Sequence, residues 1–521
     1  MKSQAIMNKK DDNFENLKEK FQEAFHEIPL NFTMPQNDEK NDASESDTSK
    51  EIMESIARFN LKPREVRDFL DRYVIQQHEA KKVLSVAICD HYNHVRRCLE
   101  NAKNLEQNYH KQNVLILGPT GVGKTYLIRT IAKRIGVPFV KADATKFSET
   151  GYVGGDVEDL VRDLVKAANG DVELAQYGII YIDEIDKIAM APSSQGRDVS
   201  GRGVQINLLK LMEDADVNLI TPTDMMGQIQ AVMNLQRGGK KAQKQSINTR
   251  HILFIFSGAF DKLSEIVKHR VEQTTIGFAA GNPVFDTGKY LHQASTQDFI
   301  KYGFEPEFIG RIPIRVACDN LTAQDLSCIL RESEGSILRQ YEEDFKGYNI
   351  DMHITREAIE EVATLAVQEK TGARGLMTIL ERLFRNFKFE LPSSGISFFE
   401  IDTETLKDKD KALKQLLLSN QPLLNKTKVE AIHAFEESFE HNHNLKIKFT
   451  EQAIKQLIEQ SIEQDKTIEA ICEQKFKDLS YALEIIAKNR KQSQFVLDVD
   501  LLQDTQKVLS QWIVSSFDKK E

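Results

Sequence analysis

The sequence predicts a doubly wound α/β domain followed by a smaller, mainly helical domain. Three short apolar runs, at 114–117 (VLIL), 179–182 (IIYI) and 252–256 (ILFIF), are separated by segments with helical spacing. Each run is continuously apolar, which is typical of a parallel strand buried on both faces. Strands that alternate with helices form a parallel sheet covered by helices. Past about Cys318 the pattern turns mainly helical, apart from a strand-like run at 398–401 (FFEI).

A chain of 521 residues is too long for one hydrophobic core, and we expect four regions. Residues 1–51 are polar and predicted to be disordered or a linker, whereas 52–316 hold the α/β domain. Residues 317–403 form the smaller domain, and 404–521 form a helical extension.

The extension resembles the segment before it at two places. The sequence ITREAI at 354–359 is echoed by FTEQAI at 449–454, and FEID at 399–402 by VLDVD at 496–500. A degenerate repeat of the smaller domain is one explanation. Shared helix and strand periodicity is the other.

Composition describes a folded protein without an obvious membrane span. Hydrophobic residues make up 40% and charged residues 28%, and no apolar run reaches the length of about 18 residues that a span needs. The N-terminus lacks a signal-peptide core. A net charge of −10 disfavours nucleic acid as the main partner. The scattered cysteines favour free thiols in a reducing cytoplasm over a disulfide framework or a zinc site: Cys89, Cys98, Cys318, Cys328 and Cys472.

A full G-x-x-x-x-G-K-[ST] motif follows the first apolar run and opens a predicted helix. Its glycines let backbone N–H groups converge on phosphate, and the helix N-terminus adds its dipole. Lys124 can reach the β- and γ-phosphates, and the Thr125 hydroxyl can bind Mg²⁺. ATP and Mg²⁺ are therefore the predicted cofactors. The predicted binding residues are Gly118, Pro119, Thr120, Gly121, Val122, Gly123, Lys124, Thr125 and Tyr126.

Paired acids end the second apolar run. Asp183, at the strand tip, can hold Mg²⁺ together with Thr125, and Glu184 can polarise the attacking water. A lone Asp-Glu pair is usually a solvated loop. After a buried strand and downstream of a phosphate loop, the pair predicts ATP hydrolysis.

With both nucleotide motifs placed, the chain from about Asn60 to Asp402 resembles ClpX, a hexameric AAA+ unfoldase family that feeds the ClpP peptidase; HslU is the second candidate. The resemblance implies that Val74 and Ile75 flank the adenine base. The next residue, Gln76, departs from the glycine usual in the family.

Two further boxes imply arginine roles. The segment 304–311 (FEPEFIGR) resembles the arginine-finger box, so Arg311 is implied to reach the γ-phosphate of the neighbouring subunit. The segment 370–376 (KTGARGL) resembles the sensor-2 box, so Arg374 is implied to link the small domain to nucleotide. Both cations suit γ-phosphate sensing, with a surface ion pair as the alternative. Ser257 stands where sensor 1 is expected.

Three loops are implied to contact proteins. Tyr152 and Val153, between glycines, match the pore loop that grips polypeptide; the alternative is a turn before a helix. Residues 197–201 (RDVSG) resemble the second pore loop, although Arg202 replaces an acidic residue common there. The tripeptide Ile276, Gly277 and Phe278 matches the element that docks onto the peptidase ring, with a buried loop anchor as the alternative.

Some features depart from the resemblance. The family's N-terminal zinc-binding domain is absent, since no cysteine precedes Cys89. Phrases such as ATKFSETGYVG lean toward HslU, but the short spacing from Val165 to Gly178 leaves no room for the large domain that HslU inserts there. His441 and His443 invite a metal interpretation, against which a solvated loop is favoured.

We therefore expect a homohexameric ATPase that threads unfolded or tagged polypeptides through a pore into a ClpP-like peptidase and is not itself a peptidase. Two alternatives stay open. One is a stand-alone remodelling chaperone or HslU-like unfoldase, and the other is a nucleic-acid motor or clamp loader of the same superfamily.

Overall fold

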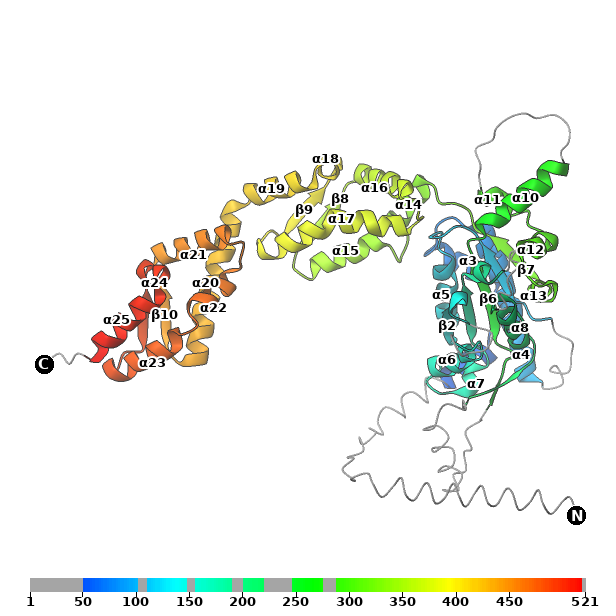
Figure 1. The fold of residues 1–521 in the computed structure, drawn as a ribbon, viewed down its shortest axis with the longest axis horizontal. Coiled ribbons are helices and arrows are strands. Elements are labelled where there is room, and N and C mark those ends of the chain that lie inside the picture. The colour runs from blue at the N-terminus through cyan, green and yellow to red at the C-terminus, as the bar shows by residue number, and fades with distance from the viewer. Residues whose placement is uncertain are drawn as a thin grey trace, which may run out of the picture. The chain divides into compact units, whose positions relative to one another are not determined.

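The chain divides into two compact units, Met1–Glu54 and Ser55–Glu521, and the second carries the features described below (Figure 1). Among the described residues, no helix combines the length and the apolar character that a membrane span requires. The computed structural model describes residues 50–101, 110–147, 155–189, 200–219, 246–274 and 287–517.

A five-stranded parallel sheet with the strand order β2-β3-β6-β1-β7 is the centre of the α/β domain. The β1, β3 and β6 strands are those predicted from the continuous apolar runs, and every residue of β1 and β6 is buried. The strands are β1 (Val114–Leu117), β2 (Phe139–Asp143), β3 (Ile179–Asp183), β6 (Leu253–Gly258) and β7 (Ile314–Ala317).

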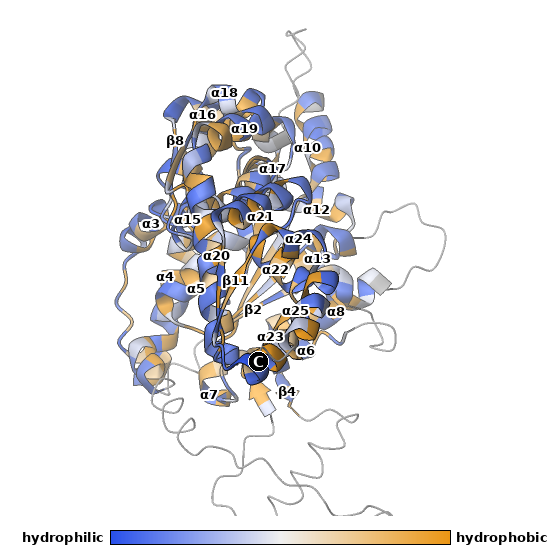
Figure 2. Cartoon of the chain, turned by 90° about the vertical axis from the view of Figure 1, so that its left-hand side faces the viewer, coloured by the Kyte–Doolittle hydropathy of each residue, from blue (hydrophilic) through white to orange (hydrophobic). Residues whose placement is uncertain are grey.

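Helices cover this sheet, which confirms the predicted doubly wound fold. The long helix α4 (His78–Glu100) packs against β1 and β7, whereas α5 (Lys124–Ile135) and α6 (Asp159–Ala167) pack against β3. The helices in Figure 2 alternate between hydrophilic and hydrophobic residues, as expected for elements with one face against a core.

The smaller domain is built on a two-stranded parallel sheet, β8 (Asp351–Ile354) with β9 (Phe398–Ile401). Alternate residues of each strand are buried, so one face of this sheet meets a core and the other meets solvent. The helices that share that core include α14 (Ala323–Arg331), α15 (Ile337–Lys346), α16 (Arg356–Gln368) and α17 (Arg374–Glu390).

The C-terminal extension repeats this arrangement around a core of its own. Its sheet is again a parallel pair, β10 (Lys446–Phe449) with β11 (Gln494–Leu497), and the burial alternates in the same way in β11. The helices that accompany it are α20 (Gln421–His443), α21 (Glu451–Glu463), α22 (Ile468–Lys475), α23 (Leu479–Arg490), α24 (Val499–Gln503) and α25 (Thr505–Phe517).

Local geometry makes the correspondence specific. Thr355 and Thr450 cap α16 and α21 with the same backbone angles, φ −70° and ψ 156°. Their N–H groups donate to the last residue of the partner strand, Ile401 at 2.9 Å and Leu497 at 3.0 Å. Periodicity alone does not specify matching caps and register at matching places, so we propose that the extension is a duplicated unit.

The interpretation of His441 and His443 as loop residues is wrong. Both lie in the last turn of α20, where basic side chains complement the helix dipole. No group of three potential metal ligands occurs in the described part of the chain.

Candidate nucleotide-binding site

The loop 118–123 joins β1 to α5 and holds three glycines at positive φ: Gly118 at 138°, Gly121 at 78° and Gly123 at 95°. A side chain is strained in that region of backbone space. A Cβ on Gly121 would also lie 2.0 Å from the carbonyl oxygen of Thr371. The loop can take this path, with its backbone close to the small domain, only because glycines form it.

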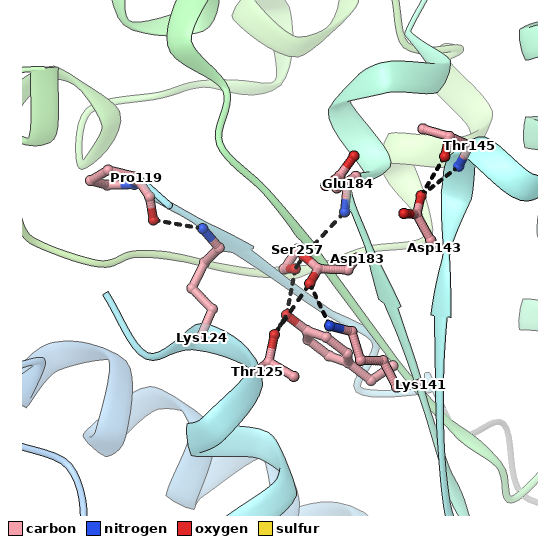
Figure 3. A network of polar contacts seen from close by, with 10 residues as sticks. Pro119, Lys124, Thr125, Lys141, Asp143, Thr145, Asp183, Glu184 and Ser257 are labelled. Atoms are coloured by element: carbon pink, nitrogen blue, oxygen red, sulfur yellow. Dashed lines mark hydrogen bonds and ion pairs between the residues drawn. The ribbon is translucent and has the colours of Figure 1, made fainter. Parts of the chain in front are cut away.

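Lys124 begins α5 and is buried at the end of this loop. Its Nζ donates to the carbonyl oxygen of Gly118 at 2.5 Å. It also donates to that of Pro119 at 2.8 Å (Figure 3). Burial lowers the pKa of Lys124, because water is withdrawn from the charged amine. A buried ammonium at a helix N-terminus is suited to an anionic ligand such as phosphate.

Asp183, at the tip of β3, is the centre of a polar cluster (Figure 3). It accepts hydrogen bonds from Ser257 Oγ at 2.5 Å and Thr125 Oγ1 at 3.2 Å, and Lys141 Nζ lies 3.2 Å from its Oδ2. Burial by itself raises its pKa, but the bonds from Ser257 and Lys141 outweigh burial and hold that pKa below its usual value. The cluster therefore contains an ionised carboxylate beside a hydroxyl, hard oxygen ligands of the kind that Mg²⁺ prefers.

Glu184 follows at the start of a left-handed turn, with φ 57° and an exposed side chain. Its N–H donates to Asp183 Oδ1 at 3.1 Å. A non-glycine residue in this region is uncommon and strained. The turn ends β3 at the acidic pair and starts the short 3₁₀ helix η3 (Ile185–Ile188).

A cavity of about 500 Å³ opens beside the phosphate loop, in the size range of ligand pockets. The polar residues that line it include Lys124, Thr125, Asp183 and Glu184. Apolar residues, which suit a nucleobase, also line it. They include Val74 and Ile75 from the segment before α4, and Leu321, Ile329, Ile337 and Met377 from the small-domain side.

The departure at Gln76 has a structural counterpart. Gln76 and Gln77 both have positive φ, 60° and 59°. Gln77 is buried, and its amide exchanges two hydrogen bonds with the backbone of Asp319, at 2.9 and 2.8 Å. The left-handed turn thus links the segment that contains Val74 and Ile75 to Asp319, which follows β7. Because glycine adopts a positive φ without strain, the turn also explains why glycine suits position 76.

The two arginines implied by the resemblance lie in different places. Arg374 lines the cavity, and the N–H of the preceding Ala373 donates to the carbonyl oxygen of Gly121 at 2.9 Å. Arg311 does not line it. Its side chain is 56% exposed and forms an ion pair with Glu213 at 2.7 Å, so within one chain Arg311 takes part in a surface ion pair, and its role as an arginine finger stays a prediction.

Sequence reasoning missed Lys141, whose signal was a lone lysine in the mixed run FVKAD. Five predicted protein-contact residues lie outside the described part of the chain: Tyr152, Val153, Ile276, Gly277 and Phe278.

Comparison with known proteins found one family model and, among the similar proteins, three relatives that share a name. Residues 109–315 match the family model described as "AAA domain (Cdc48 subfamily)". The proteins of Borrelia duttonii and Borrelia recurrentis named "ATP-dependent Clp protease ATP-binding subunit ClpX" are each 42% identical over 380 residues, which is 71% of this chain and 80% of the relative. The Treponema denticola protein of the same name is 43% identical over 339 residues, 64% of this chain and 77% of its own.

Proposed function

The chain belongs to the ClpX family, and from that premise we propose that it is an ATPase that unfolds proteins and passes them to a ClpP-like peptidase. The observation that carries this proposal is the nucleotide cavity lined by both the α/β and the small domain. A ligand held by two domains fixes their relative position, so a change in that ligand changes the position.

The residues around the cavity have distinct proposed roles. Lys124 and the N–H groups of the loop 118–123 bind the phosphates, and Thr125 with Asp183 would hold Mg²⁺. When bound, Mg²⁺ neutralises charge that develops between the β- and γ-phosphates. Glu184 accepts a proton from the attacking water as general base.

Ser257 and Lys141 hold the Asp183 carboxylate in place through the contacts described above. Arg374 contacts the nucleotide from the small domain, and Arg311 reaches the γ-phosphate of a neighbouring subunit, whose negative charge increases in the transition state. A site that needs an arginine from another copy is incomplete in a single chain. We therefore propose that the chain forms a ring, with six subunits as the family resemblance implies. We also propose that this ring works in the cytoplasm.

Substrate handling is assigned to segments outside the described residues. Tyr152 and Val153 are proposed to grip unfolded or tagged polypeptide in the pore, and Ile276, Gly277 and Phe278 to dock the peptidase.

A folded, tagged fluorescent reporter tests the proposal. With ATP, Mg²⁺ and a ClpP-type peptidase, we expect its fluorescence to disappear and peptides to form. Glu184→Gln should lower turnover by roughly 10²–10⁴ while ATP still binds. The exposed Glu357→Gln is the matched control and should behave like the unmodified chain.

The outcomes separate the alternatives. Unfolding without degradation, unchanged by Phe278→Ala, would favour a stand-alone remodelling chaperone. ATP hydrolysis stimulated by DNA and unaffected by Tyr152→Ala would favour a nucleic-acid motor and contradict the proposal.

A further inference from the structure

Gln205, on the helix α8 (Ser200–Met212), is a buried amide that joins two separate segments. Its Nε2 donates to the carbonyl oxygen of Ile188 at 3.1 Å, and its Oε1 accepts from the N–H of Glu305 at 2.9 Å. A carbonyl can only accept and an N–H can only donate, so the two partners define the orientation of the amide. The side chain is 1% exposed, so water cannot easily replace either partner.

The two segments belong to different nucleotide sites under the proposed function. Ile188 ends η3, the short helix that directly follows Asp183 and Glu184. Glu305 is the N-cap of α13 (Pro306–Gly310), and Arg311 is the C-cap of that same helix. One side chain therefore bridges η3, which follows the acidic pair proposed to serve a subunit's own ATP, and the five-residue helix that precedes the arginine offered to the next subunit.

Residues before and after Gln205 in the chain also contact the arginine box. Near its start, Arg202 pairs with Glu305 at 3.0 Å, which gives a partner to the residue that departs from the family pattern. Just past its end, Glu213 pairs with Arg311 at 2.7 Å.

The backbone of Glu213 is itself held. Its carbonyl oxygen accepts from Lys111 Nζ and Thr249 Oγ1, each at 3.3 Å. Thr249 is completely buried. The carboxylate that meets Arg311 therefore projects from an anchored point of the chain.

We propose that Gln205 is a positioning residue that couples the hydrolysis site of one subunit to the arginine finger that the same subunit extends to its neighbour. This inference rests on the proposed function. A shift of η3 that left α13 behind would leave a buried polar group of Gln205 without a partner, which is unfavourable. The three segments therefore move together, and ATP hydrolysis at one site changes the placement of Arg311 at the next.

The test compares Gln205→Met, which keeps the size of the side chain and loses both hydrogen bonds, with Ile206→Met on the neighbouring exposed position of α8. We expect Gln205→Met to lower kcat for ATP on the order of 10- to 100-fold, the loss that a small misplacement of a catalytic group produces. KM and nucleotide binding should stay near their original values, and the Hill coefficient for ATP should fall to 1. Ile206→Met should change none of these.

A double-substitution cycle tests whether Gln205 acts through the finger. Arg311→Ala should lower kcat by itself, and adding Gln205→Met should lower it no further, because residues on one path are not additive. Should Gln205→Met fail to assemble, Gln205→Glu serves the same readouts. It keeps an acceptor for Glu305, removes the amide donor to Ile188, and also places a carboxyl group at this buried position.

The outcomes are separable. Additive losses, or cooperative hydrolysis retained in Gln205→Met, would overturn the coupling role and leave the proposed function intact. An unmodified chain that hydrolyses no ATP would overturn the proposed function and the coupling with it.

Discussion

The N–H of Ala373 donates to the carbonyl oxygen of Gly121 at 2.9 Å, and this bond joins the segment 370–376 of the small domain to the loop 118–123. The two backbones approach so closely that a Cβ on Gly372, the residue before Ala373, would lie 2.7 Å from the same carbonyl oxygen. Gly372 also has a φ of 60°. The contact between the two backbones thus depends on a glycine on each side.

Gly372→Ala should separate the small domain from the phosphate loop. The added methyl group clashes with backbone, which cannot move aside as a flexible side chain can, so we expect weaker ATP binding and slower hydrolysis. Binding of a fluorescent ATP analogue and steady-state turnover measure both. Gly136→Ala is the control, because Gly136 has a φ of 85° and open space around its Cα. In both variants the free energy of unfolding should fall by about 1 kcal/mol, because alanine is disfavoured in the left-handed conformation. Gly136→Ala should nevertheless keep its ATP affinity. Equal affinity in the two variants would contradict the role of the contact.

Gln76→Gly should stabilise the protein. Glycine removes the strain of a left-handed residue that carries a side chain, which should raise the free energy of unfolding by about 1 kcal/mol. The greater freedom of glycine in the unfolded chain offsets part of this gain. Thermal unfolding measures the gain as a higher Tm. Gln77→Gly provides the contrast, since it has nearly the same φ but loses the two hydrogen bonds to Asp319. A lower Tm in Gln76→Gly would show that its side chain contributes more than its backbone angle costs.

Continuous apolar runs predicted β1, β3 and β6 because those strands are buried on both faces. They did not reveal β2 and β7, which lie at the edges of the sheet and carry polar residues such as Lys141 and Arg315. In the sequence, the proposed duplication of the C-terminal unit was indicated only by two short similar segments. Its caps and strand register became specific once β10 and β11 were seen to pair.

The candidate site divides in the same way. Two contiguous motifs, whose residue types and spacing are typical of nucleotide binding, predicted four residues of the candidate site: Lys124, Thr125, Asp183 and Glu184. Lys141 reaches Asp183 only because β2 pairs with β3. Gln205 joins segments that lie 17 residues before it and 100 residues after it. Contacts of this second kind depend on tertiary packing, which no local pattern encodes.

Acid should destabilise the α/β domain through buried histidines. His91 Nε2 faces the carbonyl oxygen of His251 at 3.0 Å, so this nitrogen carries the proton of the neutral ring. Burial, with smaller contributions from neighbouring basic groups, lowers the pKa of His91 to about 3 and that of His251 to about 4. An unfolded histidine has a pKa of about 6.5. Below that value the unfolded chain binds more protons than the folded one, so stability is present above about pH 6.5 and is lost as the pH falls toward 4.

Thermal unfolding between pH 7.5 and 4.5 measures this loss. His91→Gln keeps a donor for the His251 carbonyl and removes one titrating ring, so its Tm should fall less steeply with acid. His441→Gln, at an exposed position of α20, should follow the unmodified chain. If His91→Gln left the dependence of Tm on pH unchanged, groups other than His91 would control the loss of stability in acid.

The duplicated unit should fold without the rest of the chain. Its core draws on residues from Ile432 to Leu509, whereas the core of the small domain extends from Leu326 to Leu413. A fragment of about 100 residues with its own core is large enough to fold alone. We expect residues 421–521 to unfold cooperatively on heating, and a chain that ends at Ser419 to bind ATP as the full chain does.

A fragment that starts at Glu451 lacks α20 and β10, so it should show no cooperative transition. None of the described residues of this unit lines the cavity, so loss of ATP binding in the shortened chain would contradict its independence from the nucleotide site.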